Sequence, residues 1–146
     1  QDGFGILKVG PELTFVLREA HYALDLIASD LVPGYGERPL KQAMEAAMIA
    51  EPGNWNRHYH GDDAALAVLR HYSLSDRIRY YWAGDAAAKA GARLMEALTG
   101  LSVPLPLIWQ HLPGADAFAD APLDPEAVLI WRVTCSLASY HAACAT

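Results

Sequence analysis

Residues 11–31 read PELTFVLREAHYALDLIASDL. Apolar side chains recur in this stretch every three or four residues, at Leu13, Leu17, Ala20, Leu24, Ile27 and Leu31. That spacing places them on one face of an α-helix. Pro11 suits the first turn of a helix, and Pro33 with Gly34 ends the pattern. The stretch therefore predicts one long amphipathic helix.

Further helices are predicted along the rest of the chain by the same spacing. We expect long ones at 38–50, 62–70, 85–98 and 124–143, and short ones at 54–59, 76–82 and 106–111. Asp62 or Asp63, Ser75 and Asp124 are the expected N-caps. The apolar face of the second helix carries Leu40, Ala43, Met44, Ala47 and Met48.

One strand is predicted, at Phe4 to Val9, between Gly3 and Gly10. A lone strand cannot form a sheet, and the chain does not begin with Met, so we expect a piece of a longer protein. The fold class is then mainly α, with six to eight helices and one N-terminal strand. We place the boundary between residues 1–10, the strand and its loop, and residues 11–146, a helical domain.

The composition of the chain indicates which kinds of partner it does not bind. The 146 residues are 53% hydrophobic and carry a formal net charge of −6, which fits one globular domain without a basic stripe for nucleic acid. No apolar run reaches the roughly 18 residues that span a bilayer, so we expect no membrane partner. Cys135 and Cys144 fall about 13 Å apart on one predicted helix, too far for a disulfide. We interpret both as buried thiols in a reducing cytoplasm.

Several runs of the sequence carry a family resemblance. They are residues 6–11 with their continuation to Ala20, Glu51-Pro52 with Trp55, the run YSLSDRIRYYW at 72–82, and, more weakly, residues 110–113. In this order and spacing, the chain resembles the C-terminal third of the D-tagatose-1,6-bisphosphate aldolase subunits of the GatZ/KbaZ type. Some members of that family are labelled tagatose-6-phosphate kinases.

The resemblance implies a (β/α)8 barrel related to the class II, metal-dependent aldolases. Residues 1–10 would be its last strand and residues 11–146 a helical C-terminal domain. The implied cofactor is a divalent metal, zinc, held in barrel strands outside this chain, with none in this segment. The implied partners are a sugar phosphate and a separate catalytic aldolase subunit, in a cytoplasmic oligomer.

The strand end at Lys8 and Gly10 is the first candidate site. Barrel enzymes place their chemistry at the C-terminal ends of strands, and a glycine before a helix start aims backbone N–H groups at an anion such as phosphate. Related aldolases have Lys-Val-Asn here, whereas this chain has Gly10 followed by Pro11, which removes a side chain and one donor. The structural alternative is that Gly10 only turns the chain and Lys8 pairs with an acid.

Arg77 and Arg79 are the second candidate, because a guanidinium binds phosphate or carboxylate with two N–H groups. They lie among four aromatic residues in the run 72–82. We favour the structural interpretation, a short capped helix with ion pairs that packs its aromatic rings against the barrel. Substrate contact by one arginine is the alternative.

No catalytic residue is assigned in this chain. His58 and His60 precede Asp62, but rings on helix and loop diverge, so we expect no metal there. His21, His71, His111 and His141 occur singly and are interpreted as packing or surface residues. No P-loop, nucleotide-binding glycine fingerprint or Gly-x-Ser-x-Gly elbow is present.

Four functions follow, in order of preference. The first is reversible cleavage of D-tagatose 1,6-bisphosphate to triose phosphates, with this protein as catalyst or as the stabilising subunit. The second is a hexulose-phosphate 4-epimerase on the same barrel. A non-enzymatic scaffold subunit is third, and a tagatose-6-phosphate kinase is last because the sequence has no phosphate loop for a nucleotide.

Overall fold

The computed structural model describes residues 10–144 of the chain, and their side chains as far as residue 142. The described part contains six α-helices and three 3₁₀-helices and no strand, so the prediction of a mainly α chain is confirmed. The strand predicted at Phe4 to Val9 lies outside the described residues. In chain order the elements are α1 (Gly10–Leu31), α2 (Pro39–Ala50), η1 (Pro52–Asn54), α3 (Asp63–Tyr72), η2 (Arg77–Tyr81), α4 (Asp85–Leu98), α5 (Leu105–His111), η3 (Asp116–Phe118) and α6 (Pro125–Cys144).

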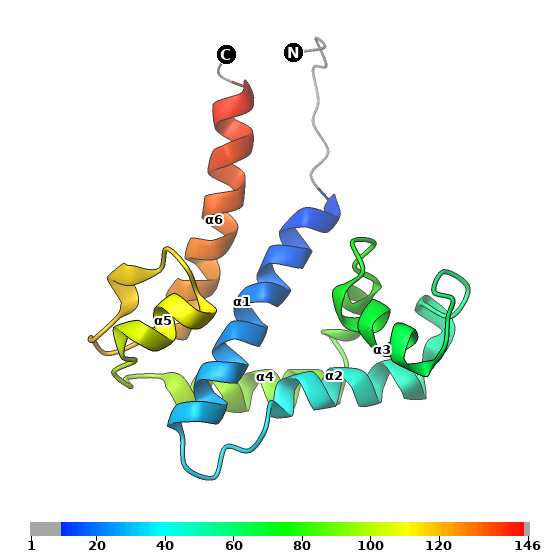
Figure 1. The fold of residues 1–146 in the computed structure, drawn as a ribbon, viewed down its shortest axis with the longest axis horizontal. Coiled ribbons are helices and arrows are strands. Elements are labelled where there is room, and N and C mark those ends of the chain that lie inside the picture. The colour runs from blue at the N-terminus through cyan, green and yellow to red at the C-terminus, as the bar shows by residue number, and fades with distance from the viewer. Residues whose placement is uncertain (1–9, 145–146) are drawn as a thin grey trace.

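The long helix α1 is the centre of the arrangement. Figure 1 shows α6 rising beside α1, with α2 and α4 crossing at one end of it. Helix α1 contacts α2, α4, α5 and α6, which is why its middle is buried on most sides. Ala20, Leu24 and Ile27, from the predicted apolar face, are fully enclosed.

The core lies where α2 and α4 pack together beneath α1. Leu40, Met44 and Met48 of α2 are fully buried, as the spacing predicts, and so are Leu94 and Leu98 of α4. Burial of such side chains supplies roughly 1.5–3 kcal/mol each. The two helices thus form one layer, and α1 packs against it.

Most helix ends follow from local chemistry. The carboxylate of Asp62 accepts from the N–H of Ala65, 2.8 Å away, and so caps α3. The carboxylate of Asp124 accepts from the N–H groups of Glu126 and Ala127 at the start of α6. Each acceptor satisfies a donor that has no partner within its helix, and both caps confirm the predictions.

Two local predictions are wrong. Residues 54–59 do not form a helix: only Pro52–Asn54 is 3₁₀, and turns follow, because their hydrogen bonds, such as that from the Tyr59 N–H to the Trp55 carbonyl, are not continued into a helical run. Ser75 is not the N-cap of the short helix at 76–82. That position is held by Asp76, in the left-handed conformation at φ 48°, and the helix covers only Arg77–Tyr81.

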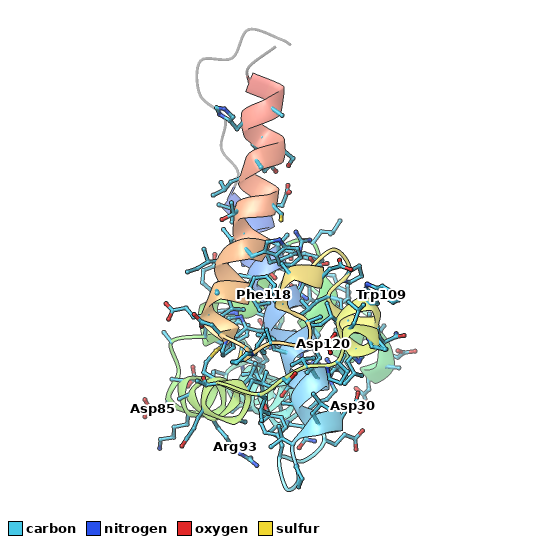
Figure 2. All side chains as sticks on the ribbon, turned by 90° about the vertical axis from the view of Figure 1, so that its left-hand side faces the viewer. Asp30, Asp85, Arg93, Trp109, Phe118 and Asp120 are labelled. Atoms are coloured by element: carbon cyan, nitrogen blue, oxygen red, sulfur yellow. The ribbon has the colours of Figure 1, made fainter. Side chains whose placement is uncertain are left out.

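The segment between α4 and α6 folds back across one side of α1. Ser102 forms an isolated antiparallel bridge with Pro122, and Trp109 donates from its indole N–H to Asp116 at 2.6 Å. Phe118 meets the ring of Trp131 of α6 edge to face. Figure 2 shows this side, with Trp109 and Phe118 near the viewer.

Helix α6 extends beyond the body of the protein, as both figures show. Its outer half touches α1 through Glu12, which accepts from Ser136 at 2.8 Å and from Tyr140. Cys135 lies on this helix as predicted, but it is exposed, so its interpretation as a buried thiol is wrong. The reason is that α6 is covered on one side only in the described part of the chain. Among residues 10–144, no helix has both the length and the apolar character that a membrane crossing needs.

Candidate functional site

Four polar side chains form a row along α1. Thr14, Arg18, Tyr22 and Asp25 are separated by four, four and three residues, which places them on one face of the helix. Arg18, Tyr22 and Asp25 are buried. Buried polar groups need partners, and each member of this row finds its partner on a different element.

Thr14 and Arg18 hold the beginning of η2. The hydroxyl of Thr14 donates to Asp76 Oδ2 at 2.6 Å, and Nε of Arg18 donates to Oδ1 of the same carboxylate at 3.1 Å. Arg18 and Asp76 are each only 1% exposed. The Arg18 guanidinium also lies 4.2 Å from the ring centroid of Phe15. A buried charge is stable only when it is paired, so this contact fixes the segment before η2 against α1.

Tyr22 begins a chain of hydrogen bonds to α3 and α2. Its hydroxyl lies 2.7 Å from Nδ1 of His71, and Nε2 of His71 lies 3.0 Å from Glu45. Arg70 donates to the same carboxylate from Nε, 2.9 Å away, and from its terminal nitrogen. The geometry fits a neutral imidazole with its proton on Nε2.

Within this row of hydrogen bonds, the pKa values of His71 and Glu45 are both lowered. Burial lowers the pKa of His71 to about 4, despite the adjacent carboxylate of Glu45. The hydrogen bond from Arg70 holds the pKa of Glu45 below its ordinary value. At neutral pH the chain is therefore a neutral histidine between a tyrosine hydroxyl and an ionised Glu45–Arg70 pair.

Asp25 holds the beginning of α2. It is fully buried and accepts from the Tyr35 hydroxyl at 2.7 Å, from the N–H of Leu40 at 3.3 Å and from the N–H of Lys41 at 3.0 Å. Arg38, at the N-cap position, makes no side-chain cap. A carboxylate at a helix N-terminus is favourable for the helix dipole as well. Helix α1 thus supplies the cap that the sequence of α2 lacks.

The structure places the predicted site residues as follows. Gly10 is exposed and is the first residue of α1, while Lys8 lies outside the described residues. Arg79 donates to the carbonyl oxygens of Ser75 and Asp76 and to the Tyr80 hydroxyl. Arg77 donates to the carbonyl oxygen of Asn54 at 3.3 Å. Both guanidinium groups therefore bind backbone carbonyl oxygens of neighbouring residues and stabilise the local structure.

Asp76 connects the segment that contains the second candidate site to α1, the helix that begins at Gly10. Its bonds to Thr14 and Arg18 place the start of η2 beside the first turns of α1. Gly10 and the segment with Arg77 and Arg79 accordingly belong to one side of the molecule, the side where α1 begins. The geometry alone assigns no reaction to this side.

The described residues offer no metal site. Among residues 10–144, no group of three or more His, Cys, Asp or Glu side chains is placed to hold an ion. His58 and His60 are exposed, and neither lies in a helix. The donor set of this part of the chain does not fit a zinc centre, which needs three or four converging ligands.

The described part of the chain is thus a set of six helices held together by a polar row on α1. Comparison of the sequence with known families shows which class of protein this is. The family model described as "D-tagatose-1,6-bisphosphate aldolase subunit GatZ/KbaZ-like" matches residues 1–145, so the chain belongs to this family.

Two relatives are named after tagatose phosphates. The chain is 52% identical, over 143 residues, to a D-tagatose 6-phosphate 4-epimerase of Agrobacterium fabrum, covering 98% of this chain and 34% of that relative. It also matches the crystal structure of a "probable tagatose 6 phosphate kinase" of Sinorhizobium meliloti 1021. That match has a TM-score of 0.87 and 47% identity, and it covers 98% of this chain and 38% of the other. The chain thus spans about a third of the length of these relatives.

The structure joins two of the sequence runs that carry the family resemblance. Thr14 and Arg18 come from the first run and Asp76 from the second, and these three side chains bind one another. Sequence reasoning missed this network and the Tyr22–His71–Glu45 chain. The available signal was the row of polar residues at helical spacing on an otherwise apolar helix.

Proposed function

We propose that the intact protein containing this chain is a D-tagatose 6-phosphate 4-epimerase. The observation that carries the proposal is the 52% identity to a relative of that name across nearly the whole chain. The 4-epimer of D-tagatose 6-phosphate is D-fructose 6-phosphate, which would be the product. This places the epimerase, the second function in the sequence analysis, ahead of the aldolase.

Epimerisation at C4 can proceed by cleavage and re-formation of one carbon–carbon bond. A base removes the proton of the C4 hydroxyl as the C3–C4 bond breaks, which gives D-glyceraldehyde 3-phosphate and a three-carbon enediolate. The aldehyde presents its other face, the enediolate attacks it, and the proton returns to the new C4 hydroxyl. The reaction consumes no redox equivalent, and the same cleavage followed by release of the fragments is an aldolase reaction.

We assign this chain a part in phosphate binding. Lys8 supplies a positive charge, and Gly10, at the start of α1, lets the backbone N–H groups approach an anion. Arg77 and Arg79 add positive charge from the segment that Asp76 holds against α1, while their hydrogen bonds go to the protein itself. The base and a divalent metal, zinc, belong to parts of the protein outside residues 10–144.

A second candidate is the subunit of a D-tagatose-1,6-bisphosphate aldolase, which the description of the family favours. In this version the substrate carries two phosphates, and the protein either cleaves it or stabilises a separate catalytic subunit within a cytoplasmic oligomer. The protruding half of α6 offers such a subunit a surface. The kinase remains last, because the chain contains no phosphate loop for a nucleotide.

The test uses the intact protein with zinc and two substrates. With D-tagatose 6-phosphate, D-fructose 6-phosphate is converted to glucose 6-phosphate and oxidised, and formation of NADPH is followed. With D-tagatose 1,6-bisphosphate, triose phosphate release is coupled to NADH oxidation, with and without a catalytic aldolase subunit. The proposal expects NADPH in the first assay without any partner. Triose release in the second assay, without NADPH in the first, would favour the aldolase.

A further inference from the structure

A groove of about 600 Å³ lies between α2 and α3, away from the residues assigned to phosphate binding. Arg38, Lys41 and Tyr72 line it, together with the apolar side chains of Ala46, Ile49 and Val68. Ile49 and Val68 are more than half exposed. These side chains give the groove an apolar wall beside its cationic end.

Two cationic side chains, Arg38 and Lys41, line this groove together with Tyr72. Burial alone would raise the pKa of Tyr72, but Lys41 and Arg38 beside the hydroxyl hold it below its ordinary value. The Lys41 ammonium lies 5.4 Å from the centroid of the Tyr72 ring. Within the described residues, Nε of Arg38 is a buried donor without a hydrogen-bond partner. Arg38, Lys41 and Tyr72 therefore form a donor cluster for an anion.

The carboxylates of the groove leave this cluster positive. Glu45 is already bound by Arg70 and His71, so its charge is balanced. Glu37 is exposed on the groove and offsets one of the two free cations. One net positive charge remains beside a tyrosine hydroxyl, which matches a singly charged anion.

The backbone of Arg38 is held in a costly conformation. Its φ of 50° lies in the left-handed region, which a residue of this kind rarely adopts. The hydroxyl of Ser29 accepts from the Arg38 N–H at 2.9 Å, and the Asp25 carboxylate holds the next residues of α2. Such strain, fixed by the surrounding structure, often marks a binding site.

We infer that this groove binds a medium-chain organic carboxylate. The carboxylate would lie on Arg38, Lys41 and Tyr72, and the hydrocarbon chain would extend along Ala46, Ile49 and Val68. Residues 41 and 49 are about 12 Å apart along the axis of α2, by the rise of an α-helix, which is of the order of an extended eight-carbon chain. A sugar phosphate fits less well, because its hydroxyls would lose hydrogen bonds over the aliphatic side chains.

The test is calorimetric titration of the intact protein with sodium octanoate as the probe. Octanamide removes the charge and acetate removes the chain. Octanoate is also titrated with D-tagatose 6-phosphate present, which occupies the proposed substrate site. The inference expects saturable binding of one octanoate, unchanged by D-tagatose 6-phosphate, with octanamide and acetate each at least about tenfold weaker. Because none of these titrations depends on turnover, failure here and failure of the proposed epimerase are distinguishable.

Substitutions then locate the site. Lys41→Gln and Tyr72→Phe are expected to weaken octanoate at least about tenfold and severalfold, respectively, from the loss of a charge-assisted and a neutral hydrogen bond. Lys89→Gln, an exposed lysine on α4, is the matched control and is expected to change nothing. Should Tyr72→Phe fail to fold, Lys41→Gln carries the test alone. Absence of saturable binding, wild-type affinity in Lys41→Gln, equal binding of acetate, or loss of octanoate binding in the presence of D-tagatose 6-phosphate would overturn the inference.

Discussion

Nε of Arg18 lies 3.1 Å from Oδ1 of Asp76, although 58 residues separate them in the sequence. Both side chains are buried, and Thr14 completes the contact from the same face of α1. Arg18 lies in the run that continues from residues 6–11 to Ala20, and Asp76 lies in the run at 72–82; both runs carry the family resemblance. Their contact shows that these runs form one physical unit, which joins α1 to η2.

Asp76→Asn is expected to destabilise this unit strongly. The variant keeps the shape of the side chain but leaves Arg18 as a buried charge without a counter-charge, a change that typically costs about 3–5 kcal/mol. Hydrogen–deuterium exchange of the intact protein checks this, because peptides covering residues 73–82 should lose protection. Glu96→Gln removes an exposed carboxylate on α4 and serves as the control. Unchanged exchange in Asp76→Asn would show that the pair does not hold η2.

Asp25→Asn is expected to loosen the beginning of α2. The carboxylate accepts three hydrogen bonds in the native structure, and an amide nitrogen would face at least one N–H or O–H donor instead. A buried donor left without an acceptor costs about 1–3 kcal/mol. Faster hydrogen exchange is expected at residues 39–50, with little change at 125–142. Equal acceleration in both segments would mean that the effect is global rather than a lost cap.

His71 should make the fold sensitive to acid. Its pKa falls from 6.5 to about 4 on folding because it is buried, so below pH 6.5 the unfolded state binds the extra proton more readily. Stability is then constant above pH 6.5 and decreases as the pH falls towards 4, by about 2 kcal/mol at pH 5. The pKa of Glu45 is lowered by Arg70, so protonation of Glu45 causes a further loss of stability at more acidic pH.

The measurement for His71 is the thermal unfolding midpoint between pH 7.5 and pH 5. The wild-type midpoint should fall across this range, and His71→Gln, which has no titrating ring, should show a shallower dependence from a lower starting value. His58→Gln, an exposed histidine, is the matched control. If His71→Gln follows the wild-type curve in slope, the buried histidine is not the source of the acid sensitivity.

Lys8→Gln tests the proposed phosphate contact. Loss of a charge-assisted hydrogen bond to phosphate costs about 1.5–3 kcal/mol, so kcat/KM for D-tagatose 6-phosphate should fall at least about tenfold. Lys89→Gln again supplies the control for loss of one lysine charge. Unchanged kcat/KM in Lys8→Gln would remove this residue from the site and leave Arg77 and Arg79 as the remaining candidates.

The sequence was informative wherever one local pattern determines the structure. Apolar periodicity identified α1 and the buried face of α2, and Asp62 and Asp124 were recognised as caps from their positions before helical runs. These features depend on residues within a few positions of one another. The same is true of the end of α4, where Gly100 takes up a positive φ of 78°.

Contacts between distant segments could not be read in this way. Ser75 looked like the cap of η2, yet Asp76 occupies that position because its carboxylate binds Arg18 and Thr14 of α1. His71 looked like an isolated packing residue, but Tyr22 and Glu45 enclose it from two other helices. Cys135 looked buried from its place in an apolar helix, whereas its side chain is exposed beside α1 and α5, because neither helix covers it. Each outcome depends on tertiary packing that a single sequence does not show.

The proposed epimerase is tested most directly by phosphorus NMR of the intact protein with zinc and D-tagatose 6-phosphate, without any nucleotide. The account predicts that the D-fructose 6-phosphate resonance grows until the two hexulose phosphates reach equilibrium, with no lasting triose phosphate signal. Starting from D-fructose 6-phosphate should give the same final mixture. Accumulation of triose phosphate, or an unchanged spectrum in both directions, would contradict the account.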